Sequence, residues 1–327
     1  MKMGRQTLKL LCVMACSVQW SCSPQLISLG PSTAEPHLST DALITADRAR
    51  LFLRTWTPKK SPRAILVALH GFNDYSNAFA DAGVYWSSRG IMVYAYDQRG
   101  FGSNEQAGQW PGVDTLVNDL AQALRVIAAT HPNRPIYLIG ESMGGAVAMT
   151  ALSRNLFKVR GVILVAPAIW GRETMNKFYP LALWLGAHTL PWVKLSGQGL
   201  GFKPSDNNAM LIALGEDPLV IKKTRIDALY GIVNLMDAAL EAAPSIRTPM
   251  LVLYGAQDEI IPKAATGKML AGLSGSPRIV IYPDGYHMLL RDLSAEVVLA
   301  DISAWITGTD GKLPSGHNEE WQLFFEK

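Results

Sequence analysis

A regular alternation of apolar runs and helical patterns constrains the fold of this chain more than any other feature of its sequence. The apolar runs are nearly continuous, which is what strands buried on both faces of a sheet require. They occupy residues 64–71, 91–97, 135–141, 161–168, 249–255 and 278–284. The helical patterns lie between several of these runs, at residues 113–130, 143–155, 262–273 and 294–307. The alternation predicts an α/β fold with a mostly parallel central sheet flanked by helices.

Two parts of the chain depart from this alternation. Before the first buried run, β-rich residues from Leu43 to Thr57 predict a hairpin. Between Ala168 and Pro249 there is no buried strand, and this connection is far longer than usual. It is rich in leucine and aromatic residues, so we expect an inserted, largely helical cap over residues 170–240. The core is expected at 41–169 and 241–308. It is followed by a polar tail at 309–327, whose position relative to the core the sequence does not predict.

Composition narrows the functional classes. Hydrophobic residues make up 49% of the chain and charged residues 17%, which is typical of a packed globular enzyme. The net charge is only +3 and no dense Lys/Arg run occurs, so the chain lacks the basic patch of a nucleic-acid-binding protein. All three cysteines lie in the first 22 residues. Disulfides, cysteine-ligated metals and a cysteine nucleophile are therefore excluded for the body of the protein, and no histidine pair has metal-ligand spacing.

The N-terminus has the pattern of an export signal. A basic stretch over residues 1–9 precedes an apolar run at 10–18, which is shorter than the roughly 20 residues that a bilayer-spanning helix needs. Residues 1–22 resemble a bacterial lipoprotein signal, in which a cysteine after a small residue is acylated. An ordinary secretory signal or an uncleaved anchor is the alternative.

Two cysteines compete for the lipid. Cys22 follows a serine and leaves a full-length apolar run before it, so we expect Cys22 to be acylated. Cys16 is the alternative, because its preceding residues look more like a cleavage box. The Pro- and Ser-rich residues 23–40 would then be a linker. These features predict a domain that is lipid-anchored on the periplasmic side of a membrane of the bacterial envelope, or a secreted or periplasmic protein if no lipid is attached.

The sharpest chemical motif is a serine between glycines, Gly140-Glu141-Ser142-Met143-Gly144. It joins a buried strand to a helix, and a serine on such a turn holds its hydroxyl above the edge of the sheet. The flanking glycines avoid collisions with strand and helix. The helix N-terminus adds partial positive charge where an oxyanion would form. We therefore predict that Ser142 is a nucleophile.

A serine nucleophile needs a base, because its hydroxyl is scarcely ionised at neutral pH. Of six histidines, His287 follows the last apolar strand, at the carboxyl end of the sheet, where the sites of such folds lie. His70 ends an early strand and suits the shaping of a loop instead. The others fall in the linker, at a helix end, in the cap and in the tail: His37, His131, His188 and His317. His287 is the predicted base.

The acid that orients the base lies between serine and histidine in folds with this serine turn. Asp258 meets this condition, immediately after an apolar strand. The second oxyanion donor comes from the loop after an early strand, His70-Gly71-Phe72. The predicted donors are therefore the backbone N–H groups of Phe72 and Met143.

Five motifs in order carry a resemblance to a known family. They are HGF at 70–72, DQRGFGS at 97–103, GESMGG at 140–145, GAQDEIIP at 255–262 and GYHMLLRD at 285–292. Over residues 40–307 the chain resembles the monoacylglycerol lipase and lysophospholipase branch of the α/β-hydrolases, of serine aminopeptidase S33 type. The resemblance implies a Ser142–Asp258–His287 triad, no cofactor, and hydrolysis of single-chain lipid esters.

Several alternatives stay open. A short-chain carboxylesterase of the same fold is the main alternative, and a non-catalytic envelope binding protein is a remote one. Ser142 excludes the branches with a carboxylate nucleophile, and Met143 argues against proline iminopeptidases. In the cap, Phe178 and Trp184 lie in the densest apolar stretch and are candidates for binding the acyl chain, although the aromatic residues there could equally pack on one another. The oligomeric state does not follow from the sequence.

Overall fold

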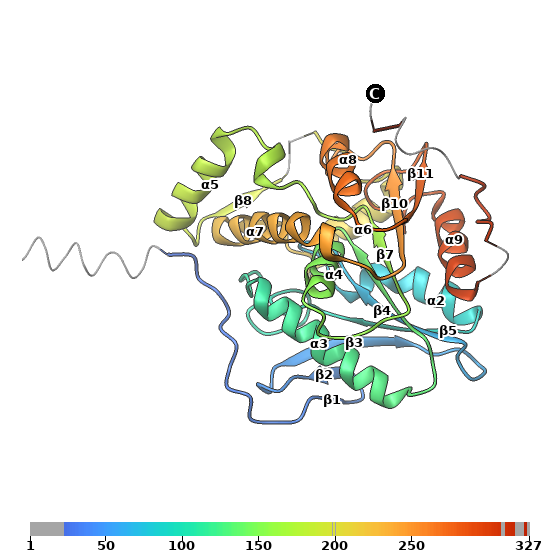
Figure 1. Cartoon of the computed structure of the whole chain (residues 1–327). Helices are drawn as coiled ribbons and strands as arrows, with labels where there is room; N and C mark the ends of the chain where they lie inside the picture. Colours follow the sequence, from blue (N-terminus) through green and yellow to red (C-terminus); the bar gives the residue numbers. More distant parts are fainter. Residues whose placement is uncertain (1–22, 198, 200, 309–310, 318–323, 326–327) are drawn as a thin grey trace, which may run out of the picture.

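A nine-stranded sheet organises the protein, with strand order β1-β2-β3-β5-β4-β6-β7-β10-β11 (Figure 1). The computed structural model describes residues 23–197, 199, 201–308, 311–317 and 324–325. The strands are β1 (His37–Leu38), β2 (Ala42–Ile44), β3 (Arg50–Trp56), β4 (Ala64–Leu69), β5 (Ile91–Tyr96), β6 (Ile136–Glu141), β7 (Gly161–Val165), β10 (Met250–Gly255) and β11 (Arg278–Tyr282). In the part of the sheet ordered β5-β4-β6-β7-β10-β11, all neighbouring strands are parallel. The strands β2 and β3 form the antiparallel hairpin. The predicted fold class is confirmed.

Helices cover both faces of the sheet, and successive residues of each strand serve opposite faces. In β4, Ile65 and Val67 pack toward one helical layer, while Leu66 and Ala68 pack toward the other. The first layer comprises α3 (Val113–Thr130), α4 (Met143–Ser153), α7 (Ile226–Ala242) and α8 (Lys263–Gly272). The second comprises α2 (Ala80–Ser88) and α9 (Ala295–Thr307). Continuous apolar strands are therefore explained by burial on both sides.

The helix α2 was not among the predicted helices. It follows a short 3-10 turn, η1 (Ser76–Phe79), and it contains Gly83, which lowers helix propensity. A Cβ at Gly83 would lie 2.3 Å from the ring of Trp56. The glycine that obscures the helix in the sequence is the residue that lets this helix approach β3.

The segment predicted as a cap contains η2 (Arg172–Thr174), α5 (Phe178–Thr189), β8 (Lys194–Ser196), α6 (Asn208–Glu216) and β9 (Lys223–Arg225). The strands β8 and β9 form a small antiparallel sheet of their own. The next helix, α7, packs against α4 and continues through η3 (Ala243–Ser245) toward β10. The part of the insertion that stands away from the core therefore ends near Arg225, which is earlier than residue 240.

The Pro-rich segment over 23–40, expected as a linker, runs along the domain (Figure 1). Ile27 is buried and its N–H donates to Trp110 O at 3.0 Å, and β1 pairs with β2. The predicted signal segment, with Cys16 and Cys22, lies outside the described residues. Across the described residues, no helix combines the length and the apolar character needed to cross a bilayer. In the tail, Leu313 is buried beside α9.

Candidate active site

Ser142 occupies a strained turn between β6 and α4. Its backbone has φ 50° and ψ −114°, a conformation that costs a residue with a side chain on the order of 1–3 kcal/mol. Two glycines make the turn possible. A Cβ at Gly140 would lie 2.3 Å from Gly144 O, and one at Gly144 would lie 2.1 Å from Leu69 O. Backbone bonds hold the strained residue, because Ser142 N–H donates to Val165 O at 2.9 Å.

His287 and Asp258 meet at the carboxyl ends of the neighbouring strands β10 and β11. His287 Nδ1 lies 2.8 Å from Asp258 Oδ2, and the Asp258 side chain is fully buried. The other carboxylate oxygen, Oδ1, accepts the N–H groups of Ile260 and Ile261 at 2.8 and 3.0 Å. Asp258 therefore has no rotational freedom, and it holds the imidazole with Nδ1 protonated and Nε2 as the free base.

The charges around His287 favour its protonated form. Burial by itself lowers the pKa of the imidazole, but the carboxylates of Asp258 and Glu141 outweigh burial and the opposing charge of Arg291, so the pKa is raised. Glu141 immediately precedes Ser142, so a charge next to the serine turn contributes to the raised pKa of the predicted base. A raised pKa makes His287 a stronger proton acceptor during attack by a hydroxyl.

The loop after β4 lies over the serine. Because β4 and β6 are adjacent parallel strands, with Leu69 opposite Gly140, the loops that follow them share one edge of the sheet. A Cβ on Gly71 would lie only 3.5 Å from Ser142 Cβ. Behind Gly71, His70 Nε2 accepts Gln98 N–H at 2.9 Å, which leaves Nδ1 to donate to Gly71 O at 2.8 Å. Burial lowers the pKa of His70, so this histidine stays neutral and shapes the loop.

The two predicted oxyanion donors directly follow the two residues of this contact in the chain. Met143 is the first residue of α4, so its N–H has no acceptor within the helix. Phe72 directly follows Gly71, and its ring packs edge-on against Phe101 and Trp110 at centroid distances of 5.8 and 6.0 Å. The two predicted donors thus belong to the loop that follows β4 and to the first turn of α4.

One largely buried arginine joins three loops of the site, and the sequence reasoning missed it. Arg291 Nη2 lies 2.7 Å from Asp74 Oδ2 and 3.4 Å from Glu141 Oε2. Asp74 follows the oxyanion loop, Glu141 precedes the serine and Arg291 follows His287. Burial raises the pKa of Glu141, against the effect of the arginine. The sequence did offer one signal for this cluster. A charged residue lies within or just after each of three motifs: Asp74 after HGF, Glu141 in GESMGG and Arg291 in GYHMLLRD.

The cap residues predicted to bind an acyl chain are not enclosed. Phe178 exposes 77% of its surface and Trp184 exposes 47%, both on α5, where only Ala187 is buried. Trp184 stacks on His188 with centroids 4.5 Å apart. The structure therefore brings Ser142, Asp258 and His287 to one edge of the sheet but leaves these two aromatic side chains facing solvent.

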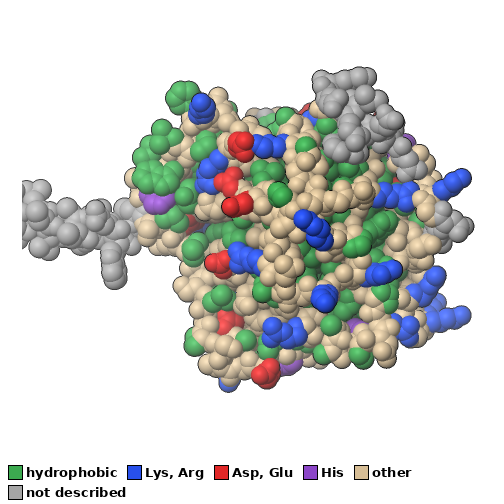
Figure 2. Space-filling view, viewed as in Figure 1, with side chains coloured by type: hydrophobic (Ala, Val, Ile, Leu, Met, Phe, Trp, Pro, Cys, Tyr) green, Lys and Arg blue, Asp and Glu red, His purple; other side chains and the backbone are tan. Residues whose placement is uncertain are grey.

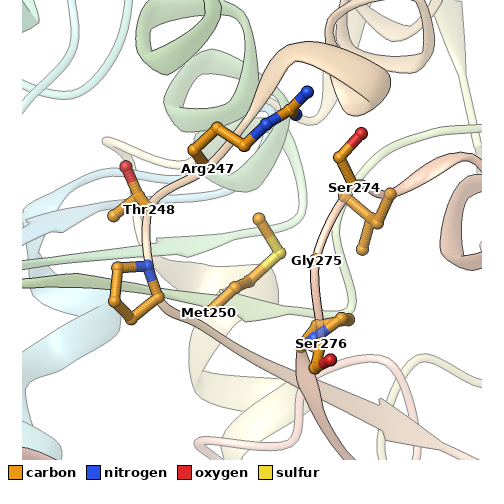
Figure 3. Close-up of a pocket in the computed structure, with 9 residues that line it drawn as sticks. Arg247, Thr248, Met250, Ser274, Gly275 and Ser276 are labelled. Carbon is orange, nitrogen blue, oxygen red and sulfur yellow. The ribbon is translucent and has the colours of Figure 1, made fainter.

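A small hollow elsewhere has no part in this site. Arg247, Met250 and Ser276 are among its lining residues, at the amino ends of β10 and β11 (Figure 3). Asp258 and His287 follow the carboxyl ends of the same two strands. The hollow and the site are thus at opposite edges of the sheet.

The chain is similar to proteins of known activity. The chain is 26% identical to monoglyceride lipase from Rattus norvegicus over 279 residues, which is 83% of this chain and 91% of that protein. It is 24% identical to monoacylglycerol lipase from Mycolicibacterium smegmatis, over 79% of this chain and 92% of the relative. A solved structure of a soluble variant of monoglyceride lipase from Saccharomyces cerevisiae, in complex with a substrate analogue, superposes with a TM-score of 0.70 at 20% identity, covering 88% of this chain and 99% of the other.

A family model described as serine aminopeptidase, S33, matches residues 60–294. This range contains the strained serine turn, the histidine–aspartate pair and the loop over the serine. The protein therefore belongs to the serine aminopeptidase S33 family of α/β-hydrolases, and it is a serine hydrolase.

Proposed function

We propose that the protein hydrolyses carboxylic esters of single-chain lipids, of the monoacylglycerol or lysophospholipid type. The observation that carries the proposal is the strained Ser142 beneath Gly71, at the same edge of the sheet as a histidine fixed by a buried aspartate. The monoglyceride lipases to which the chain is similar support the substrate class.

We assign each group a role that is consistent with its position. Ser142 Oγ attacks the ester carbonyl carbon while His287 Nε2 takes its proton, and Asp258 stabilises the resulting imidazolium. The carbonyl oxygen becomes an oxyanion that accepts hydrogen bonds from the N–H groups of Phe72 and Met143. The bond between carbonyl carbon and alkoxy oxygen then breaks, and the alcohol leaves with the proton from His287. Water attacks the acyl-enzyme by the same route and releases the fatty acid.

A panel of p-nitrophenyl and glycerol esters from C2 to C18 tests this assignment. Each buried methylene contributes about 0.8 kcal/mol, so a lipid ester hydrolase gains kcat/KM from C4 to at least C8. Activity that peaks at C2–C4 would assign the protein to the short-chain carboxylesterases. The exposure of Phe178 and Trp184 is the observation that favours that second candidate, because neither side chain encloses an alkyl chain.

We also propose that acyl chains on Cys22 hold the protein on the periplasmic side of a membrane of the bacterial envelope. The described chain begins near the cap: Gln25 N–H donates to Asp227 Oδ2 at 3.3 Å, and Arg225 Nη2 donates to Gln25 Oε1 at 3.0 Å. A lipid on Cys22 would be attached three residues before Gln25, or about 10 Å of fully extended chain.

The surface beside this point is suited to a bilayer. We call it the cap face, and it consists of the exposed residues Phe178, Tyr179, Leu181, Trp184, Leu185, Leu190, Trp192 and Leu195. Figure 2 shows hydrophobic side chains gathered over α5. Leu195 on β8 lies opposite Thr224, next to Arg225. Between Thr174 and Ser205 the sequence has no acidic residue but three lysines, a composition that favours contact with anionic lipids.

Fractionation and mass spectrometry test the anchor. The wild-type protein is expected in the membrane fraction, with an N-terminal peptide that starts at an acylated Cys22. The Cys22→Ser variant should lose this modification, while Cys16→Ser should keep it. An unmodified N-terminus after residue 22 in the wild type would contradict the proposal, and an acylated Cys16 would transfer it to the other cysteine.

A further inference from the structure

The oxyanion loop is tied to the cap through Asn73, the residue after Phe72. Asn73 has φ 65°, in the left-handed region that a residue with a side chain seldom adopts. Two hydrogen bonds to the cap keep it there. Asn73 Nδ2 donates to Thr224 Oγ1 at 2.7 Å, and Asn73 O accepts Ile221 N–H at 2.9 Å. A third bond lies close by, because Tyr75 OH donates to Asp217 Oδ2 at 2.7 Å.

The strand β9, whose Thr224 accepts the hydrogen bond of Asn73, also contacts an N-terminal arm, which we define as residues 25–27. Thr224 is buried on β9, and the next residue, Arg225, donates to Gln25 Oε1. Gln25 N–H donates to Asp227, whose side chain is fully buried and pairs with Arg225. The arm therefore contacts the end of β9 at Arg225 and the start of α7 at Asp227.

The same arm also reaches Phe72 by a second route. Leu26 forms a β-bridge with Trp110, and Ile27 N–H donates to Trp110 O at 3.0 Å. Trp110 is 1% exposed, and its ring packs against the ring of Phe72. One short segment of chain thus supports both Phe72, through Trp110, and Asn73, through β9.

We propose that the N-terminal arm and β9 form a bracket that positions the Phe72 N–H for the oxyanion, with Asn73 and Thr224 as positioning residues. The inference rests on the proposed role of Phe72. An oxyanion donor acts only if it lies about 2.7–3.1 Å from the place where the charge develops, so a small shift of the loop lowers kcat without loss of substrate binding. Residues 25–27 are then a working part of the site, and not a linker.

A pair of substitutions at one position separates positioning from packing. Thr224→Val keeps the shape but removes the acceptor of Asn73, whereas Thr224→Ser keeps the hydroxyl and loses the methyl group. We expect Thr224→Val to lower kcat about tenfold at unchanged KM, a fraction of the roughly 10²–10³-fold effect of losing a whole donor. Thr224→Ser should remain within about twofold of wild type. Gln25→Ala should lower kcat in the same direction as Thr224→Val.

Inhibitor binding gives a readout that reduced stability alone would not change. A trifluoromethyl ketone forms a tetrahedral oxyanion on the serine, so Thr224→Val should weaken it about as much as kcat falls, while a non-reactive alcohol analogue should bind as before. Equal kcat values for the Val and Ser variants would overturn the bracket. If instead the wild type showed no esterase activity, the proposed function would fail, and the two failures are therefore distinguishable.

Discussion

The floor of the site and the cap differ in how their side chains are held. By the floor we mean Ser142, Asp258 and His287 together with Arg291 and its two carboxylate partners. In the floor, the buried carboxylate of Asp258 accepts two backbone N–H groups and contacts His287, and Arg291 ties three loops together. In the cap, α5 buries only Ala187 and exposes Phe178 and Trp184. A catalytic group must be fixed before the reaction begins, so its surroundings are fully bonded. The cap face, which we propose to meet lipid, leaves apolar area exposed, and with few buried contacts it belongs to the less stable part of the fold.

The largest expected effects come from the floor. Ser142→Ala should lower kcat about 10⁵–10⁶-fold, since knocking out a triad serine removes nearly all covalent catalysis. Asp258→Asn should lower it about 10⁴-fold, because the amide favours the wrong imidazole tautomer. Steady-state hydrolysis of a soluble C4 ester measures both, and labelling of Ser142 by a fluorophosphonate checks the nucleophile. A loss below tenfold for Asp258→Asn would point to another carboxylate as the orienting acid.

The pH dependence sharpens the description of the floor. His287 acts as a base only when neutral, and Asp258 and Glu141 raise its pKa against the opposing effects of burial and Arg291. The acid limb of kcat/KM should therefore lie above pH 6.5, with the rate falling tenfold per pH unit below it. The folding stability depends on pH in the opposite direction to the rate. Because the pKa of His287 is raised in the folded protein, its stabilising effect is fully present below the unfolded-state pKa and is lost as the pH rises through the folded-state pKa. A kcat/KM profile from pH 4 to 9 that is flat down to pH 5.5 would contradict this assignment.

Removal of Arg291 tests how much the floor depends on its buried charges. Arg291→Met leaves Asp74 and Glu141 without their cation, and removing one partner of a buried ion pair costs about 3–5 kcal/mol. Chemical denaturation should show this loss. The triple variant that adds Asp74→Asn and Glu141→Gln is the matched control, because it neutralises the stranded carboxylates and should recover much of the stability. Equal stability of the single and triple variants would show that the arginine acts through packing alone.

The same contrast explains what the sequence could predict. Local sequence patterns predict the scaffold beneath the site well. The apolar strands, the hairpin and the bounds of α3 follow from burial on two faces and from helical periodicity. The chain order of serine, acid and histidine then places Asp258 and His287 at adjacent strand ends, where they meet. Arg291 was missed because its partners, Asp74 and Glu141, are distant in sequence and no local pattern joins them.

Predictions for the cap and the N-terminal segment went less far, for a related physical reason. An apolar residue such as Trp184 has the same sequence signal whether it packs in a pocket or faces a lipid surface. The prolines and serines at 23–40 are typical of a linker, yet Gln25 and Ile27 make specific contacts through backbone groups, which every sequence provides. The bracket around Asn73 depends on such contacts and could not be predicted.

The smallest effect is expected in the cap, where the way the substrate is presented should matter. Leu185 on the cap face is 48% exposed, and Leu156, which follows α4, is 51% exposed, so serine substitutions at the two positions form a matched pair. If the cap face meets lipid, Leu185→Ser forfeits part of the roughly 1.5–3 kcal/mol of a buried leucine, and hydrolysis of monoacylglycerol in anionic vesicles should fall about fivefold. Leu156→Ser should leave that rate unchanged. Neither variant should alter the rate on a soluble C4 ester, because the triad and the oxyanion loop are untouched. Vesicle assays with protein lacking the lipid, as in Cys22→Ser, isolate the contribution of the face from that of the anchor. Equal vesicle rates for the two leucine variants would show that the exposed residues of α5 take no part in lipid contact, and the comparison between floor and cap would then concern stability alone.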